Sequence, residues 1–252
     1  MTRDELKEFL DFKANEFNSP SFILTDPIQI PHSYANKEDI EIIGFIVATI
    51  AWGNRKMIIR NGEKLKTLFG ESPYDFVMEA RNSLLENIDF THRTFNSEDL
   101  RNFILSLRNI YLDEGGIEGV FEKVQNQPMK EKIIYFNKVF TSKFESSRSH
   151  KHVANPAKGS AAKRINMYLR WMCRKDQNNV DFGLWNVIPS SELHLPLDVH
   201  SGRIARKLGL LHRNQNDWKA VEELQFSLVD LDPIDPCKYD YALFGLGAFE
   251  NF

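Results

Sequence analysis

The spacing of apolar residues predicts a chain built almost entirely from helices. Ile40, Ile43, Val47 and Ile50 recur at three- and four-residue steps in a segment that is apolar on nearly every side, which is typical of a helix at the centre of a core. The same spacing predicts helices over about 2–17, 55–69, 100–111, 117–125, 128–145, 160–175, 199–208, 217–230 and 236–249. Three prolines make the segment 19–32 irregular.

Helix-start signals support this assignment. Thr2 with Glu5 forms a capping-box pair, and Asn96 with Asp99 offers a cap for the helix that follows. No segment alternates convincingly between apolar and polar residues as a half-buried strand does. The predicted class is therefore all-α.

Composition narrows the setting of the protein. The longest uncharged apolar run, 42–54, is much shorter than the roughly 20 residues that span a membrane. Charged residues interrupt the segment after Met1, so no secretory segment is expected. Two cysteines exclude a disulfide framework and a four-cysteine metal or iron–sulfur site within one chain. We expect a cytoplasmic, monomeric protein without cofactor or metal.

Charge is distributed unevenly along the chain. The protein has a net charge of -3, yet the window 143–175 contains nine Lys and Arg residues and a single acid, Glu145. A local basic window in an acidic protein favours a polyanion site, although a solvated loop and helix face would give the same pattern.

The first candidate motif is Pro156-Ala157-Lys158-Gly159-Ser160-Ala161-Ala162-Lys163-Arg164. Ser160 is expected to cap a helix, which would place Lys163 at the third helical position. The positive end of the helix dipole and neighbouring Arg164 would then lower the pKa of Lys163, as a nucleophilic lysine requires. The alternative is a surface lysine without a role.

The second motif is Leu195-Pro196-Leu197-Asp198-Val199-His200. Asp198 is expected to cap the helix that contains Ile204 and Leu208. Such a residue is either a cap only, or a fixed carboxylate that also stabilises a developing cation.

Together the two motifs resemble the helix-hairpin-helix DNA glycosylases. Gly159 with Lys163 matches the hairpin's glycine-to-lysine spacing, and Pro196 with Asp198 matches the Pro-x-Asp element. Ala161 stands where the usual second hairpin glycine would be, and Lys163 and Asp198 are 35 positions apart, which is longer than in most members. Over the whole chain, GSAAKRINMYLRWM, VDFGLW and LPLDVHSGRIARKLGL resemble an uncharacterised bacterial family of unknown function.

The glycosylase resemblance implies a fold and a reaction. It implies one globular unit, 1–252, with a cleft between two helical lobes: about 38–175, a helical barrel ending in the hairpin, and 1–37 with 176–252. Lys163 would attack C1′ of a flipped nucleotide in damaged DNA with help from Asp198, and strand cleavage by a lyase step would follow. The implied nucleic-acid contacts are Lys158, Gly159, Ser160, Arg164, Arg203, Trp52 and Asn54.

For two of these residues, a purely structural role is the alternative. Trp52 would either stack on a base or pack in the core, and Asn54 would either fill the space left by the flipped base or cap a helix. Two other classes of function also remain. One is a nucleic-acid-binding module without catalysis, and the other is an all-α protein that acts on a small molecule or a protein partner.

Overall fold

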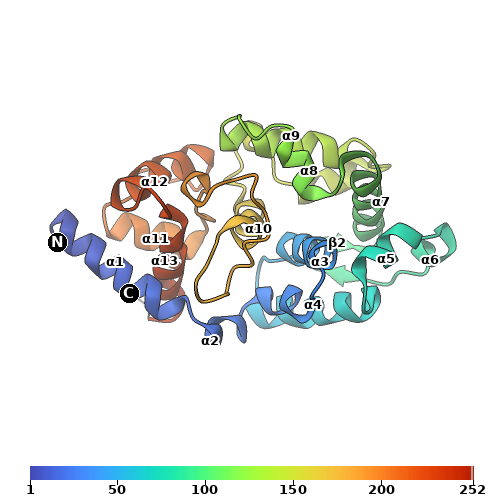
Figure 1. Cartoon of the computed structure of the whole chain (residues 1–252), viewed down its shortest axis with the longest axis horizontal. Coiled ribbons are helices and arrows are strands. Elements are labelled where there is room, and N and C mark those ends of the chain that lie inside the picture. The colour runs from blue at the N-terminus through green and yellow to red at the C-terminus, as the bar shows by residue number, and fades with distance from the viewer. Residues whose placement is uncertain (251) are drawn as a thin grey trace. The chain divides into compact units, whose positions relative to one another are not determined.

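A computed structural model describes residues 1–250 and 252, and it confirms the all-α class (Figure 1). Contacts divide the chain into two compact units: unit 1, made of 1–24 and 155–252, and unit 2, made of 25–154. These boundaries differ from those of the expected lobes, because the segment 155–175 belongs with the C-terminal part of the chain. Arg170 and Arg174 of that segment form ion pairs with Asp181 and Asp235.

Unit 2 is organised around one buried helix. Its helices are α3 (Lys37–Thr49), α4 (Arg55–Phe69), α5 (Pro73–Glu79), α6 (Asn82–Glu86), α7 (Ser97–Glu114), α8 (Ile117–Glu122) and α9 (Met129–Thr141), with 3-10 turns at Pro27–Gln29, Pro31–Ser33 and Ser147–His152. Every residue from Asp39 to Thr49 in α3 is buried. The ring of Phe45 in α3 packs 5.8 Å from that of Phe103 and 4.9 Å from that of Phe140. The prediction that this segment, apolar on nearly every side, forms the central helix of a core is therefore confirmed.

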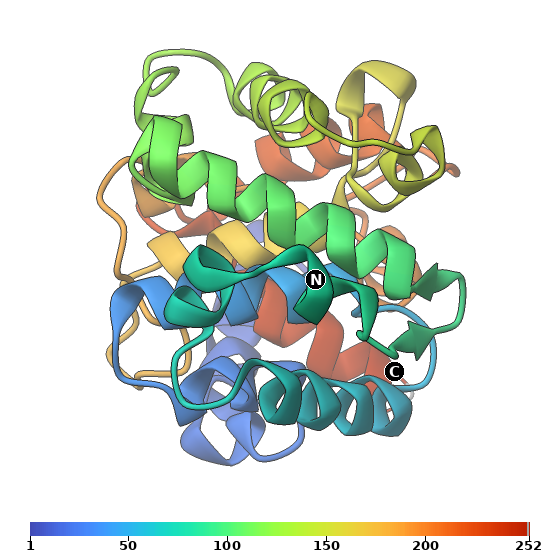
Figure 2. The same cartoon turned by 90° about the vertical axis from the view of Figure 1, so that its right-hand side faces the viewer.

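A short hairpin precedes the longest helix of unit 2. The strands β1 (Thr91–His92) and β2 (Phe95–Asn96) pair antiparallel, a feature that the apolar pattern did not predict. Asn96 then caps α7, shown in green in Figure 2, and the capping box with Asp99 is confirmed. A two-residue strand is too short for alternation to be recognised in the sequence.

Unit 1 contains both ends of the chain. Its helices are α1 (Arg3–Phe17), α2 (Pro20–Ile23), α10 (Lys163–Cys173), α11 (Val199–Lys207), α12 (Trp218–Leu231) and α13 (Tyr239–Ala248), with 3-10 turns at Pro156–Lys158, Ser190–Glu192 and Pro236–Lys238. The capping box of Thr2 and Glu5 begins α1, as predicted. Helix α13 contacts both α1 and α11. At Gly245 the ring of Phe17 occupies the space that a Cβ atom would need, so glycine permits the close approach of α1.

Candidate active site

Lys163 is the first residue of α10, not the third. Ala162 is the N-cap residue, with φ 52° in the left-handed region. The predicted cap is wrong because Ser160 is engaged in the preceding loop: its Oγ accepts the Ala162 N–H at 3.1 Å. Its backbone also forms a bridge with Asp217 at the start of α12. Lys163 still lies where the backbone N–H groups of a helix end are exposed.

The Lys163 side chain extends along α10 and is half-buried. Its Nζ lies 3.5 Å from Sδ of Met167, one turn further along the helix. Arg170 follows at the next turn of the same face, since residues seven apart are close in angle on a helix. Beside Lys163, burial lowers the pKa of Arg164 to about 10, which leaves its guanidinium charged at neutral pH.

Asp198 is the N-cap of α11, as predicted. Its Oδ1 accepts the backbone N–H groups of His200 at 2.8 Å and Ser201 at 3.0 Å. Within residues 1–250 and 252, its Oδ2 accepts no hydrogen bond and the carboxylate forms no ion pair. The carboxylate therefore caps the helix through one oxygen and keeps the other available.

A third ionisable group, Asp240 of α13, connects the two predicted residues. Asp240 is 7% exposed, and its Oδ2 accepts a hydrogen bond from Nη1 of Arg170. The pKa of Asp240 is raised to about 7, mainly by burial; Asp198 and Asp181 contribute to the rise, while Arg170 and Lys163 oppose it. The charges of Lys163 and Asp198 thus both act on the Asp240 carboxyl.

We call Lys163, Asp198, Asp240 and Arg170 the lysine cluster. Sequence reasoning missed Asp240 and Arg170. Asp240 is the only acid in the otherwise apolar segment 239–249, and a charged residue in such a helix is seldom buried without a partner. This contrast between one acid and its apolar neighbours was the signal in the sequence that could have identified Asp240.

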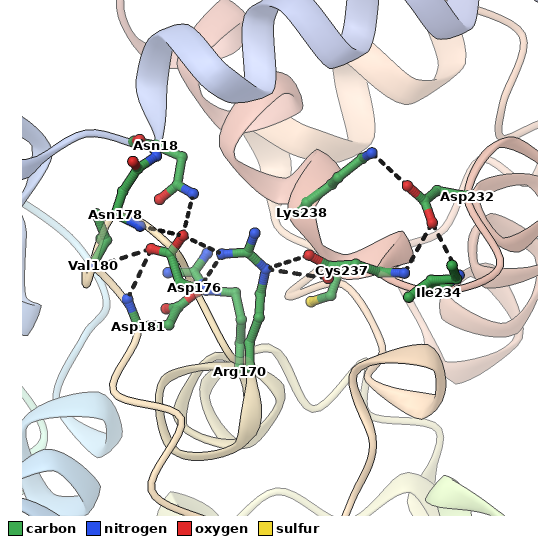
Figure 3. A network of polar contacts seen from close by, with 12 residues as sticks. Asn18, Arg170, Asp176, Asn178, Val180, Asp181, Asp232, Ile234, Cys237 and Lys238 are labelled. Atoms are coloured by element: carbon green, nitrogen blue, oxygen red, sulfur yellow. Dashed lines mark hydrogen bonds and ion pairs between the residues drawn. The ribbon is translucent and has the colours of Figure 1, made fainter.

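The lysine cluster rests on a buried ion-pair network. Arg170 Nε donates to Oδ1 of Asp181 at 3.1 Å, and Arg174 Nη1 donates to Oδ2 of the same carboxylate at 2.9 Å. Arg174 Nε also reaches Asp235 at 3.0 Å. Although burial opposes it, the surrounding carboxylates raise the pKa of both arginines. Figure 3 shows Asp176 beside this network, where its carboxylate accepts hydrogen bonds from the side-chain amide of Asn18 and from the backbone N–H of Val180.

The network corrects the interpretation of the basic window. Arg170 and Arg174 are buried and paired with acids, so they offer no charge to a polyanion. Arg148, in unit 2, is paired with the buried Asp99. Lys158 and Gly159 of the hairpin loop are exposed. The acids that neutralise the arginines lie outside the window, Asp181 just beyond it and Asp99, Asp235 and Asp240 much further away in the chain, which is why a local charge count overestimated the basic surface.

The other predicted contact residues have structural partners. Arg203 donates to the carbonyl oxygens of Phe252 at 2.6 Å and Gly247 at 3.2 Å, and so binds the end of α13. Asn54 caps α4 by accepting the Met57 N–H at 3.1 Å, which confirms the cap interpretation.

Trp52 lies in unit 2, whereas Lys163 lies in unit 1. It is half-buried, and its ring packs edge-on against His92 at 4.8 Å and stacks on His152 at 6.0 Å.

Two kinds of feature are not found in the described part of the chain. Among residues 1–250 and 252, no three His, Cys, Asp or Glu side chains are grouped so as to hold a metal ion. None of the helices described there is long and apolar enough to cross a membrane. Both cysteines, Cys173 and Cys237, are buried and unbridged.

The fold and the lysine cluster define an all-α protein in which a lysine at a helix start is linked electrostatically to the buried carboxyl group of Asp240. The chain belongs to a family described as protein of unknown function (DUF2400), whose model matches residues 26–249. This confirms the resemblance to an uncharacterised family. Comparison with curated proteins and with solved structures returned no match.

Proposed function

We propose that the protein is a DNA base-excision glycosylase with lyase activity, of the helix-hairpin-helix type, and that Lys163 is its nucleophile. The observation that carries the proposal is the lysine cluster: a lysine at the first position of α10 whose charge acts on the same buried carboxyl as that of Asp198. Damaged duplex DNA is the proposed substrate, and a monomer in the cytoplasm is the proposed working form.

The reaction follows from these groups. The neutral amine of Lys163 adds to C1′ of the flipped nucleotide, the glycosidic bond breaks, and the base leaves with the bonding electrons and takes up a proton. Asp198 supplies negative charge beside the cationic sugar that develops at C1′. Loss of a proton from the adduct's nitrogen and ring opening give an iminium ion, from which elimination of the 3′ phosphate nicks the strand.

Borohydride trapping tests the nucleophile. The purified protein is incubated with duplex oligonucleotides that carry different base lesions, and covalent adducts, base release and nicking are read separately. Lys163→Gln is expected to abolish trapping and to retain DNA binding. Lys219→Gln is the matched control, because it removes an exposed lysine of the same unit that is not among the proposed DNA contacts, and it is expected to leave trapping intact.

Asp198→Asn tests the carboxylate without removing the cap. Asparagine caps a helix about as well as aspartate, so the fold is retained while the charge is lost. Base release is expected to slow by about 100-fold or more, the range of a lost electrostatic group. Asp217→Asn makes the same change at the cap of α12 and should leave the rate unaltered.

Two results would overturn the proposal. An adduct that persists in Lys163→Gln assigns the nucleophile to another amine. Absence of any adduct across all lesions, with duplex binding preserved in wild-type protein, favours the non-catalytic nucleic-acid-binding alternative.

A DNA contact at the hairpin is tested by salt dependence. Lys158→Ala is expected to flatten the slope of log affinity against log salt by about 0.9, which corresponds to one phosphate contact. Lys123→Ala removes an exposed lysine outside the basic window and serves as control. Equal slopes for both variants and wild type would exclude Lys158 from the DNA contact.

A further inference from the structure

The carboxyl group of Asp240 has one engaged oxygen and one open oxygen. Oδ2 is held by Nη1 of Arg170, whereas Oδ1 accepts no hydrogen bond from any residue of 1–250 or 252. Arg170 follows Lys163 by seven residues on α10, so both cations lie on one helix face. Met167 lies between them, and the Lys163 ammonium extends toward it. Arg170, which lies on the same face of α10 as Lys163, therefore holds Asp240 in place.

The surroundings of Asp240 are charged on several sides. Its α10 neighbours are Arg170 and Lys163, the loop after α10 contributes Asp181, and the start of α11 contributes Asp198. The buried thiol of Cys237, in the turn before α13, is also within electrostatic reach. Among the other titratable groups on elements that pack against α13, Asp11 of α1 acts on Tyr239, and His200 of α11 contacts the Gly247 carbonyl at the far end of the helix.

We propose that Asp240 is the proton acceptor that converts the Lys163 ammonium into the nucleophilic amine, an inference that rests on the proposed glycosylase function. One N–H bond of Lys163 breaks, its electron pair stays on nitrogen, and the proton binds the Asp240 carboxylate. The amine then adds to C1′ as described above. No further reactant is needed.

The assignment separates the roles of the two carboxyl groups. Asp198 is fixed by two backbone N–H groups at a helix end and supplies charge. Asp240 is buried, and a pKa near 7 allows it to hold or release a proton at neutral pH. A proton acceptor is most effective when its pKa is close to the working pH.

The test combines two measurements on Asp240→Asn, whose side-chain oxygen can still accept the Arg170 hydrogen bond. Single-turnover trapping of a lesion duplex, measured from pH 6 to 9, gives the rate of attack. Acylation of Lys163 by acetic anhydride, followed by mass spectrometry over the same pH range, gives the fraction of neutral amine without DNA. We expect trapping at neutral pH to fall by about 100-fold or more, as for loss of a general base.

Asp240→Asn is expected to affect acylation and trapping in opposite directions: the Lys163 amine becomes more available to the anhydride, while trapping slows. This difference makes the test specific. Loss of the Asp240 charge removes an interaction that favours the ammonium, so the Lys163 acylation midpoint is expected to move to lower pH. A residue with an electrostatic role alone would then give faster trapping, whereas a proton acceptor gives slower trapping. Asp181→Asn is the control for a loosened Arg170, and its loss of rate is expected to be much smaller.

Each outcome decides the inference. Unchanged or faster trapping in Asp240→Asn, with wild type active, overturns the role of Asp240 and leaves the proposed function standing. Absence of trapping by wild type overturns the proposed function and the inference with it.

If Asp240→Asn fails to fold, carbon-13 NMR of the Asp240 carboxyl is compared between wild type and Lys163→Gln. Loss of the ammonium should raise the Asp240 titration midpoint, and an unchanged midpoint would contradict the inference.

Discussion

Replacing Arg170 by methionine should destabilise unit 1 to an extent that depends on pH. The guanidinium is buried and holds two buried carboxyl groups, Asp181 through Nε and Asp240 through Nη1. Methionine fills a similar volume without charge. Removing one partner of a buried ion pair costs about 3–5 kcal/mol, because the remaining charge is left uncompensated.

The pH dependence follows from Asp240. Its folded pKa of about 7 lies above the ordinary value of 3.8 that applies to the unfolded chain. The folded state therefore holds more protons than the unfolded state between about pH 4 and 7, and stability decreases as the pH rises through this window. Loss of Arg170 removes an interaction that opposed this rise, so the Asp240 pKa increases further in the variant. The loss of stability should be greatest at pH 8 and smaller at pH 5.5 by at least about 1 kcal/mol.

Tryptophan fluorescence makes unit 1 observable by itself. Three of the four tryptophans, Trp171, Trp185 and Trp218, lie in unit 1. Urea unfolding is therefore followed in a Trp52→Phe background at pH 8 and pH 5.5. Arg213→Met is the control, because its pair with Asp217 is partly exposed and such pairs contribute about 0–1 kcal/mol. A loss for Arg170→Met equal to the control's, or greater at pH 5.5 than at pH 8, would refute the reasoning.

Substitutions at three further positions test the backbone, the packing and a helix cap, each measured by urea unfolding. Ala162→Gly should stabilise unit 1 by about 1 kcal/mol, since Ala162 adopts a positive φ that glycine takes without strain; a loss of stability would show that the Ala162 methyl group contributes more than the strain. Gly245→Ala should cost about 1–3 kcal/mol, because its Cβ would meet the Phe17 ring; a neutral effect would mean that the ring moves freely. Asn54→Ala should cost about 1 kcal/mol through the lost cap of α4, whereas Asn54→Ser should be nearly neutral, and equal losses would exclude capping as the cause.

Local signals in the sequence predicted local structure well. The capping boxes at the start of α1 and α7 and the cap at Asp198 involve residues within three positions of each other, and all are confirmed. The failure at Ser160 has a partly non-local cause: its Oγ accepts the nearby Ala162 N–H, but its backbone pairs with Asp217, more than fifty positions later. The short helices α5 and α6 have too few residues to show a periodic pattern.

The residues of the candidate site divide in the same way, into those that a local motif identified and those that only distant contacts reveal. Lys163 and Asp198 were found because each belongs to a short motif at a helix start. Asp240 and Arg170 belong to no motif, and their importance comes from contacts between segments far apart in the chain. Charge counting failed for Arg170 in particular, since burial beside Asp181 changes a surface cation into a core residue.

A single ionisation at Asp240 connects the stability of unit 1 to the proposed chemistry. Ionised Asp240 is the form that can accept the Lys163 proton, and it is also the form that is less favourable in the folded state, because burial and two neighbouring carboxylates oppose the charge. Arg170 and Lys163 reduce this penalty, so transfer of the lysine's proton relieves the buried charge as the amine becomes reactive. Activity in the proposed reaction should therefore rise with pH around the folded Asp240 pKa of about 7, which is where the loss of stability that begins near pH 4 comes to an end.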